Sequence, residues 1–432
     1  MIGSRDRFGC RNAAGYIDKL DPEIFPFISY EGYPDRYPAC SVIEKPDAFY
    51  REMRQAAGQL FAVFSRALRV FQKCPDEFMK MMDIPEKMRP YLNIPNRLNS
   101  PTFLSRFDFV LDRSGQFRCI ELNADTPCAV VEAYYGNRVA ADYVRRRDPN
   151  EGALEQLQSL LDRISADNPS LLFHPESGGL QDRPFVFSCF HDYIEDLATT
   201  KFLMNQLPQG RNREFVSFYD LSLDDQGVRL PDGRHAGVLY RLHPLELLVE
   251  ETAEDGFPLG TRLLELYQQN KFLLFNPPES IILQCKGFQA LVWGLYEANE
   301  FFDAQERAVI ERYLVPSYFV ENRHKLLGRP YIRKPIWGRE GNGITLFDAQ
   351  GCPLETKALD GPNEVVERES RTELYQAFVD SETVTIDTDS GRQDGYMTYS
   401  CFMTGNEASA VYSRFSPDKI CGLESYWVPL VE

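Results

Sequence analysis

The sequence predicts a mixed α/β (α+β) fold that combines antiparallel hairpins, one long helix and a small strand–helix lobe. Two stretches, 105–123 and 396–414, alternate polar and apolar residues on both sides of a turn, which is typical of β-hairpins. Residues 47–74 repeat apolar side chains every three or four positions, which indicates an amphipathic helix. Short apolar runs between 184 and 242 alternate with helical segments, as in α/β lobes. A chain of 432 residues is long enough for two or three lobes.

One helix dominates the first hundred residues. Residues 1–45 are rich in Pro, Tyr and Asp, and we expect them to be irregular and to pack on the surface of the body. Pro46 and Asp47 are start signals for the helix over 47–74, whose apolar stripe is typical of a face that packs into a core. Several prolines between 85 and 95 then mark a connection to the first hairpin.

The first hairpin carries an unusual set of polar side chains on one face. Residues two apart in a strand share a face, so Arg106 lies beside Asp108 on one strand, and Glu121 lies beside Asn123 on the other. Two carboxylates and an amide oxygen are hard ligands that suit Mg²⁺, and the arginine fork suits phosphate oxygens. The alternative interpretation is a solvated hairpin face with one salt bridge.

The middle of the chain is predicted to form a small α/β lobe. Residues 124–128 lack strand character and are typical of a binding loop that leads into a helix. A buried strand at 184–190 ends in the polar residues 191–196 before the next helix, and α/β folds place ligand contacts at such junctions. The expected helices are 130–144, 151–170 and 197–207, and the further strands are 215–219 and 237–242.

The last third changes character and is predicted to be mainly antiparallel. Ile281 and Ile282 are interpreted as the end of a strand before Lys286 and a helix over 287–297. Residues 331–347 indicate a strand, a glycine-rich turn and a returning strand. Gly405 and Asn406 form the tight turn of the hairpin over 396–414.

The glycine-rich turn at 338–343 can bring backbone N–H groups close to an anion, because glycine has no Cβ and tolerates the required dihedral angles. It is not a P-loop, and such a turn is often only structural. Lys334 lies four residues upstream and could reach the same phosphates as Lys286, although each lysine alone could be a solvated side chain. Together with the carboxylates, these residues suggest a nucleotide held with Mg²⁺ between two antiparallel layers. Phosphoryl transfer needs mainly such positioning and charge neutralisation, and Arg414 is a candidate second cation for it.

Composition excludes several other classes. The formal net charge of −17 argues against a nucleic-acid backbone or an anionic membrane as the main partner. The ten cysteines are scattered without a C-x-x-C pair, and the five histidines have no metal spacing, which argues against zinc and against triad chemistry. The opening residues lack a signal-peptide core and no run is long enough for a membrane helix, so we expect a cytoplasmic protein with reduced thiols.

These blocks resemble the C-terminal synthetase domain of the glutathionylspermidine synthase family, whose members are ATP-grasp carboxylate–amine ligases. The similar pieces are R-F-D-F at 106–109, E-L-N-A-D-T-P at 121–127 with Glu132, E-D-L-A-T-T at 195–200, R-L-H-P-L-E at 241–246, Lys286 in Q-C-K, K-P-I-W-G-R-E-G at 334–341, Y-Q at 375–376 and A-V-Y-S-R-F at 410–415. They occur in family order, and the metal-binding block precedes the lysines, as in the permuted arrangement of this family. The amidase domain of the bifunctional members is not matched, so the resemblance implies ligation alone.

The resemblance implies a role for each matched residue. Asp108, Glu121 and Asn123 would hold Mg²⁺, and Arg106 and Arg414 would stabilise the acyl phosphate and the tetrahedral intermediate. Lys286, Lys334, Gly338, Glu340, Gly341 and Gln376 would bind ATP, with the Tyr375–Gln376 segment beside the adenine. Thr126 and Cys128 would contact a peptide substrate, and Glu195 and Asp196 would contact a polyamine. Cys128 stands where a hydroxyl residue is expected and the acidic pair is Glu-Asp, which leaves both substrates open.

The resemblance also implies an ATP-grasp-like fold and divides the chain into four regions. These are an N-terminal region at 1–104, a metal-binding hairpin and helix at 105–145, a pre-ATP-grasp-like lobe at 146–280 and a nucleotide-binding region at 281–432. The expected reaction joins a peptide or amino-acid carboxylate to a (poly)amine through an acyl phosphate. The alternatives are a peptide-tailoring ligase with a different acceptor and a non-catalytic homologue that binds nucleotide or peptide. The oligomeric state is left open.

Overall fold

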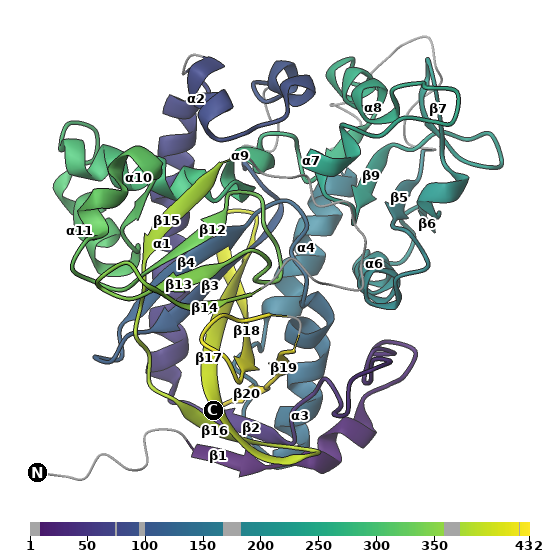
Figure 1. Ribbon diagram of the computed structural model, residues 1–432. Helices are drawn as coiled ribbons and strands as arrows, with labels where there is room; N and C mark the ends of the chain where they lie inside the picture. The colour runs from purple at the N-terminus through teal and green to yellow at the C-terminus, as the bar shows by residue number, and fades with distance from the viewer. Residues whose placement is uncertain (1–8, 74–75, 95–99, 167–182, 358–371, 423) are drawn as a thin grey trace, which may run out of the picture.

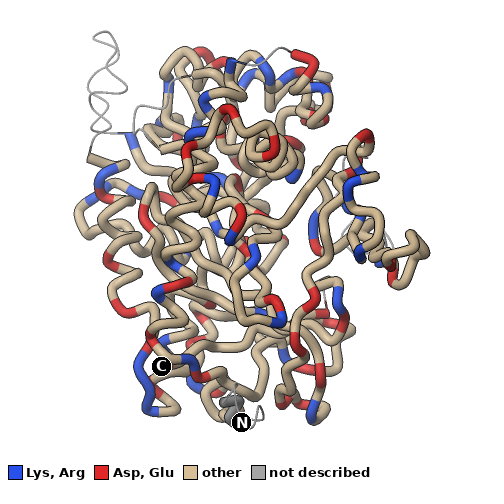
Figure 2. The backbone as a smooth tube through the Cα atoms, turned by 90° about the vertical axis from the view of Figure 1, so that its left-hand side faces the viewer, with Lys and Arg blue, Asp and Glu red and all other residues tan. Residues whose placement is uncertain are grey.

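The computed structural model describes residues 9–73, 76–94, 100–166, 183–357, 372–422 and 424–432 as a mixed α/β protein with several sheets (Figure 1). In the described part of the chain, no helix is both long and apolar enough to cross a membrane. Acidic and basic residues are interspersed along the whole backbone, so the net negative charge does not come from a single acidic tract (Figure 2).

The central sheet is built from the two predicted hairpins, which are both confirmed. Its strand order is β19 (Tyr426–Trp427), β18 (Glu407–Ser416), β17 (Gly391–Thr404), β3 (Leu104–Leu111) and β4 (Phe117–Asn123), and β16 (Val384–Thr388) also pairs with β17. The two hairpins join because β17 pairs antiparallel with β3. The joined sheet has one polar face and one apolar face.

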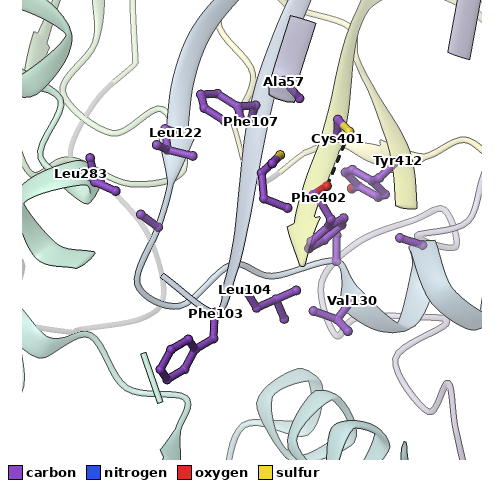
Figure 3. Packing of buried hydrophobic residues seen from close by; sticks show 14 of the residues in the cluster. Ala57, Phe103, Leu104, Phe107, Leu122, Val130, Leu283, Cys401, Phe402 and Tyr412 are labelled. Carbon is purple, nitrogen blue, oxygen red and sulfur yellow. Dashed lines mark hydrogen bonds between the residues drawn. The ribbon is translucent and has the colours of Figure 1, made fainter. Parts of the chain in front are cut away.

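The apolar face packs on the predicted long helix, α1 (Asp47–Phe71). Phe107 of β3 lies opposite Leu122 of β4, and both are buried in the core shown in Figure 3. Phe64 of α1 contacts the Phe107 ring edge to face, with 5.7 Å between ring centroids. The helix confirms the interpretation of its apolar stripe as a core face.

A second antiparallel sheet crosses the first one (Figure 1). Its order is β11 (Ser317–Tyr318), β15 (Glu373–Ala377), β12 (Tyr331–Pro335), β13 (Thr345–Phe347) and β14 (Pro353–Thr356). Strands β12 and β13 and the loop between them confirm the predicted strand, turn and returning strand. The helices α10 (Gly287–Ala298) and α11 (Ala304–Tyr313) precede this sheet in the chain.

The middle of the chain forms a parallel sheet with helices, as predicted, on the right of Figure 1. Its order is β10 (Leu273–Phe275), β9 (Val238–Arg241), β5 (Phe185–Ser188) and β6 (Arg213–Phe215), accompanied by α6 (Ile194–Gln206), α7 (Leu245–Leu248) and α8 (Leu259–Gln268). A short hairpin, β7 (Ser222–Asp224) with β8 (Gly227–Arg229), lies between β6 and β9 in sequence. The helices α2 (Asp76–Met81), α3 (Asn137–Val144) and α4 (Ala153–Ala166) lie outside these groups.

Three local predictions were wrong. Residues 1–45 are not all irregular, because β1 (Gly9–Asn12) and β2 (Ser41–Glu44) pair with each other and β2 pairs with β20 (Leu430–Val431). Ile281 and Ile282 lie in a short helix, α9 (Ser280–Gln284), and not in a strand. Strand β6 ends at Phe215, and residues 218–220 form a 3₁₀ turn. The proposed division into four regions stays a prediction.

Candidate active site

The polar face of the first hairpin is assembled as the residue spacing predicted. Arg106 lies opposite Asn123, and Asp108 lies opposite Glu121. Arg106 holds Asp108 with two hydrogen bonds, Nε to Oδ1 at 2.8 Å and Nη2 to Oδ2 at 2.9 Å. Asn123 Nδ2 donates to Asp108 Oδ2 at 3.2 Å, and Ser400 on β17 donates to Asp108 Oδ1 at 2.8 Å. The face is therefore a built network and not a solvated surface with one salt bridge.

A β-bulge in β4 shapes this face. Asp108 pairs with Glu121 while the next residue, Phe109, pairs with Cys119, so Ile120 is the extra residue of the bulge. The bulge sends Cys119 into the core and Glu121 to the polar face. It also frees the Ile120 carbonyl, which accepts a hydrogen bond from Lys334 Nζ at 3.0 Å. The bulge therefore joins the two antiparallel sheets at the site.

The two predicted lysines both reach this face. Lys286 Nζ lies 3.2 Å from Glu121 Oε1 and donates to the Gly338 carbonyl at 2.6 Å. Lys334 Nζ also donates to Gln376 Oε1 at 3.0 Å, so the predicted Gln376 is held beside it. Lys286 thus connects the carboxylate face with the glycine-rich loop, although the segment before it is helical and not the predicted strand.

The charges at this face are mutually compensated. Burial alone would raise the pKa of Asp108, but the charge of Arg106 and its hydrogen bonds hold that pKa below the ordinary value, with help from Arg414. Burial would likewise raise the pKa of Glu121, and Lys286 and Lys334 hold it low. Burial lowers the pKa of Lys334 to about 8, although Glu121 opposes this effect. The carboxylates are therefore charged at neutral pH, as metal ligands must be.

The loop Gly338–Gly343 contacts two other parts of the chain. Gly341 has φ = 75°, and a Cβ at this position would collide with the carbonyl of Cys421. Arg339 forms an ion pair with the buried Glu246 of α7. Glu340, which was predicted to bind nucleotide, also lies close enough to the acidic pair of α6 for its charge to raise the pKa values of both carboxyl groups. The loop thus connects the central site with the parallel-sheet lobe.

The predicted substrate residues lie around the same loop. The Cys128 carbonyl accepts a hydrogen bond from Arg106 Nη1 at 2.7 Å, and Thr126 is half-buried two residues earlier. Cys128 is exposed at the surface, where desolvation by the atoms around it and the charge of Asp196 raise the pKa of its thiol, and this effect of Asp196 places α6 beside the loop. Helix α6 begins at Ile194, so Glu195 and Asp196 lie in its first turn and not in the preceding loop. Glu195 is exposed and Asp196 half-buried, and desolvation by the surrounding residues together with repulsion from neighbouring carboxylates raises the pKa of Glu195 to about 7 and that of Asp196 to about 6.

Residues 124–128 are anchored by side chains that the sequence did not single out as functional. Asp125 forms a fully buried ion pair with Arg241, with side-chain exposures of 0% for both. Asp125 also accepts from the Leu245 N–H at 2.9 Å. Gln284 accepts from the N–H groups of residues 124 and 125, and Asn276 donates to the Asp125 carbonyl at 2.7 Å. The only sequence signal was that Asp125 and Arg241 both fall inside the matched blocks.

The donor types at the hairpin suit Mg²⁺, and because each Asp108 oxygen already accepts two hydrogen bonds, a bound cation would displace one of those donors. Among the described residues no three His, Cys, Asp or Glu side chains gather to hold a metal. The candidate set is two charged carboxylates and an amide, Asp108, Glu121 and Asn123, and the Nδ2 contact of Asn123 leaves its Oδ1 for a cation. Hard oxygen ligands with room for water and phosphate oxygens match the preference of Mg²⁺. Whether these residues, the lysines and the loop contact metal, nucleotide and substrate stays a prediction.

Comparisons with known proteins agree with the resemblance read from the sequence. The chain is 25% identical over 263 residues to a Haemophilus influenzae protein named "Putative acid--amine ligase", an alignment that covers 58% of this chain and 57% of that protein. The chain thus spans little more than half the length of this relative. A family model described as glutathionylspermidine synthase preATP-grasp matches residues 47–431. This match covers most of the sequence and contains every predicted site residue, so the chain belongs to the glutathionylspermidine synthase preATP-grasp family.

Proposed function

We propose that this protein is a Mg²⁺- and ATP-dependent carboxylate–amine ligase with an ATP-grasp-like fold. The observation that carries the proposal is the position of Lys286, whose Nζ lies between Glu121 and the carbonyl of Gly338. This contact brings a carboxylate face, a lysine and a glycine-rich loop to one place between two antiparallel sheets. Such a site can neutralise a triphosphate from both sides.

The proposed reaction has two steps. A substrate carboxylate oxygen attacks the γ-phosphorus of ATP, which gives an acyl phosphate and releases ADP. An amine nitrogen then attacks the acyl carbon, the C–O bond to phosphate breaks, and the nitrogen loses a proton. When bound, Mg²⁺ would neutralise charge on the transferring phosphate.

The chain's own residues account for the remaining requirements. The ammonium groups of both lysines are held in position before substrates bind. Glu121 holds Lys286, and the Ile120 carbonyl and the Gln376 side chain hold Lys334. Arg106 is fixed by Asp108 and the Cys128 carbonyl and can hold the charge that develops on the acyl group. Arg414 on β18 lies close enough for its charge to lower the pKa of Asp108. Glu195 and Asp196 would hold a cationic amine by charge and hydrogen bonds.

The test is ADP release in the presence of ATP, Mg²⁺, glutathione and a panel of amines that includes spermidine, with the product identified by mass. ADP release that requires both a carboxylate and an amine supports ligation. Activity with other amino acids or peptides in place of glutathione would favour a tailoring ligase of the same chemistry. Tight ATP binding without turnover over a broad panel would contradict catalysis and favour a nucleotide-binding homologue.

Replacing Lys334 with alanine is expected to weaken ATP binding by at least about tenfold, because a hydrogen bond to a charged group contributes roughly 1.5–3 kcal/mol. Isothermal titration with a non-hydrolysable ATP analogue measures the change. Lys87→Ala is the matched control, since Lys87 pairs with Glu250 at 2.8 Å on the surface. An unchanged nucleotide affinity in Lys334→Ala would count against the assignment.

Binding of the amine is expected to weaken as the pH falls through the range in which the acidic pair takes up protons. Glu195, with a pKa of about 7, and Asp196, with a pKa of about 6, lose their charges when the pH drops from 8 to 5.5. The KM for the amine should then rise much more than the KM for ATP. In the double variant Glu195→Gln/Asp196→Asn, the amine KM should be high at pH 8 and should change little down to pH 5.5. Equal effects on both KM values would remove the acidic pair from the acceptor site.

A further inference from the structure

A buried series of hydrogen bonds lies near Arg106 and includes a residue from the N-terminal segment. The Tyr37 hydroxyl donates to Glu132 Oε1 at 2.9 Å. The hydroxyl of Tyr37 also lies 3.1 Å from the hydroxyl of Tyr412 on β18. Glu132 lies in the helical turn that follows the loop 124–128, and its side chain is buried. Three separate segments of the chain therefore meet at this carboxylate.

The Tyr412 end of this hydrogen-bonded series reaches the candidate active site. The guanidinium of Arg106 lies over the ring of Tyr412, 5.8 Å from its centroid. Arg106 is the residue that holds Asp108 and the Cys128 carbonyl. Cation–aromatic contacts of this kind stabilise and orient a buried guanidinium. The Tyr412 ring thus packs against the guanidinium of Arg106, and the Tyr412 hydroxyl is held by its hydrogen bond with Tyr37.

The charge state of Glu132 determines which group donates in each hydrogen bond of this series. A charged carboxylate can only accept, so Tyr37 donates to it and the Tyr37 oxygen is left to accept from Tyr412. A protonated carboxyl could donate instead, which would reverse both bonds. The titratable and charged groups that face Glu132 are Tyr37 from the N-terminal segment, Tyr412 from β18, Arg106 from β3 and Cys128 from the adjoining loop, and of these only Arg106 is charged near neutral pH.

We infer that Glu132, Tyr37 and Tyr412 form a positioning network that holds Arg106 in place for chemistry on the acyl group. The inference rests on the proposed function for the step that Arg106 serves. Tyr37 lies before residue 47, where the family match begins, so part of the site's support comes from outside the matched region. Arg106 is the group that would contact the reacting atoms, and the other three act through it.

Electrostatics supports the same assignment and makes it testable. Burial raises the pKa of Glu132 to about 7, although its own backbone N–H, Tyr37 and Arg106 oppose the rise. The carboxylate should therefore gain its charge as the pH rises through about 7. Above this pH, Tyr412 would donate to Tyr37 and Tyr37 would donate to the charged Glu132. Below it, the protonated Glu132 could donate, and both hydrogen bonds could reverse.

The first test does not depend on activity. The Nε–H resonance of Arg106, assigned by its loss in Arg106→Lys, is followed by NMR between pH 5.5 and 8.5. We expect it to shift with a midpoint near the pKa of about 7 in the wild type and to stay constant in Glu132→Gln. A resonance that does not respond to pH in the wild type, or that responds equally in Glu132→Gln, would overturn the inference, whatever reaction the protein catalyses.

The second test uses the ligation assay. Tyr37→Phe is expected to lower kcat by about tenfold, because residues that orient a catalytic group typically contribute 10–100-fold, with the KM for ATP changed less than about twofold. Tyr30→Phe is the matched control, since its ring packs against Tyr37, 5.8 Å between centroids. Tyr412→Phe keeps the ring and should resemble Tyr37→Phe, and its folding is checked by the unfolding midpoint. Equal kcat values in Tyr37→Phe and Tyr30→Phe would overturn the positioning role.

Discussion

Glu121→Ala is expected to lower ATP-dependent amide formation by at least about 100-fold, because even groups that only orient metal ligands typically cost 10–100-fold when removed. Glu121 is one of two charged carboxylates in the candidate Mg²⁺ site, and Lys286 Nζ lies 3.2 Å from it. Its removal therefore has two effects at once, since it deletes a candidate metal ligand and leaves Lys286 without its carboxylate partner. The rate is measured by ADP release at saturating ATP over a series of Mg²⁺ concentrations.

Nucleotide binding without metal distinguishes these two roles. Lys286 and Lys334 lose a competing carboxylate in Glu121→Ala, so the affinity for ATP measured in a chelator should stay equal or increase. With Mg²⁺ present, the affinity should rise less in the variant than in the wild type. Glu250→Ala removes an exposed carboxylate from a surface ion pair and should behave as the wild type in every assay. Wild-type turnover in Glu121→Ala would retire the metal assignment.

The polar face of the hairpin could be predicted because strands and hairpin turns constrain it strongly. The side-chain period of two fixes which residues share a face, so Arg106 was placed beside Asp108 and Glu121 beside Asn123, and the turn at 112–115 joins the two strands as an antiparallel pair. Alternation also identified the second hairpin, β17 with β18, which carries Arg414. Local patterns were enough for these residues because the partners are close in sequence.

The bulge at Ile120 could not be predicted from the same pattern. An extra residue shifts the phase of the alternation, and here the shift appears only as two adjacent apolar residues, Cys119 and Ile120, which does not tell which of them leaves the pairing; packing of Cys119 in the core decides it. The bulge matters because it exposes the carbonyl that holds Lys334. The contact that joins the two sheets was therefore not visible in the sequence, although Lys334 had been singled out.

The helix α9 shows a different limit. Every residue of Ser280–Gln284 is buried, so the segment has no polar face from which a period can be read. Short apolar runs do not distinguish a buried strand from a buried helix, and the strand prediction at Ile281 failed for this reason. The error did not move Lys286 out of the site, because the helix ends just before it.

The ion pair of Asp125 with Arg241 joins residues 116 positions apart, and no local rule could connect them. Both side chains are completely buried, and the pair links the loop after β4 to the end of β9. Asn276 and Gln284 hold the backbone of the same loop. The loop that carries Thr126 and Cys128 is thus positioned by the parallel-sheet lobe and α9 as well as by Arg106 of the hairpin from which it emerges.

Arg241→Met is therefore expected to lower the free energy of unfolding by about 3–5 kcal/mol, because it leaves the Asp125 carboxylate buried without its counter-charge. Asp125→Asn/Arg241→Met should be less destabilised than Arg241→Met alone, since the neutral amide still accepts from the Leu245 N–H without a buried charge. Arg234→Met removes two surface ion pairs, to Glu214 and Asp232, and should cost less than about 1 kcal/mol. Urea unfolding followed by circular dichroism measures all three. If Arg241→Met cost no more than Arg234→Met, or if the second substitution added to the loss, Asp125 would not depend on Arg241 for its charge, and the loop would owe its position to Asn276 and Gln284.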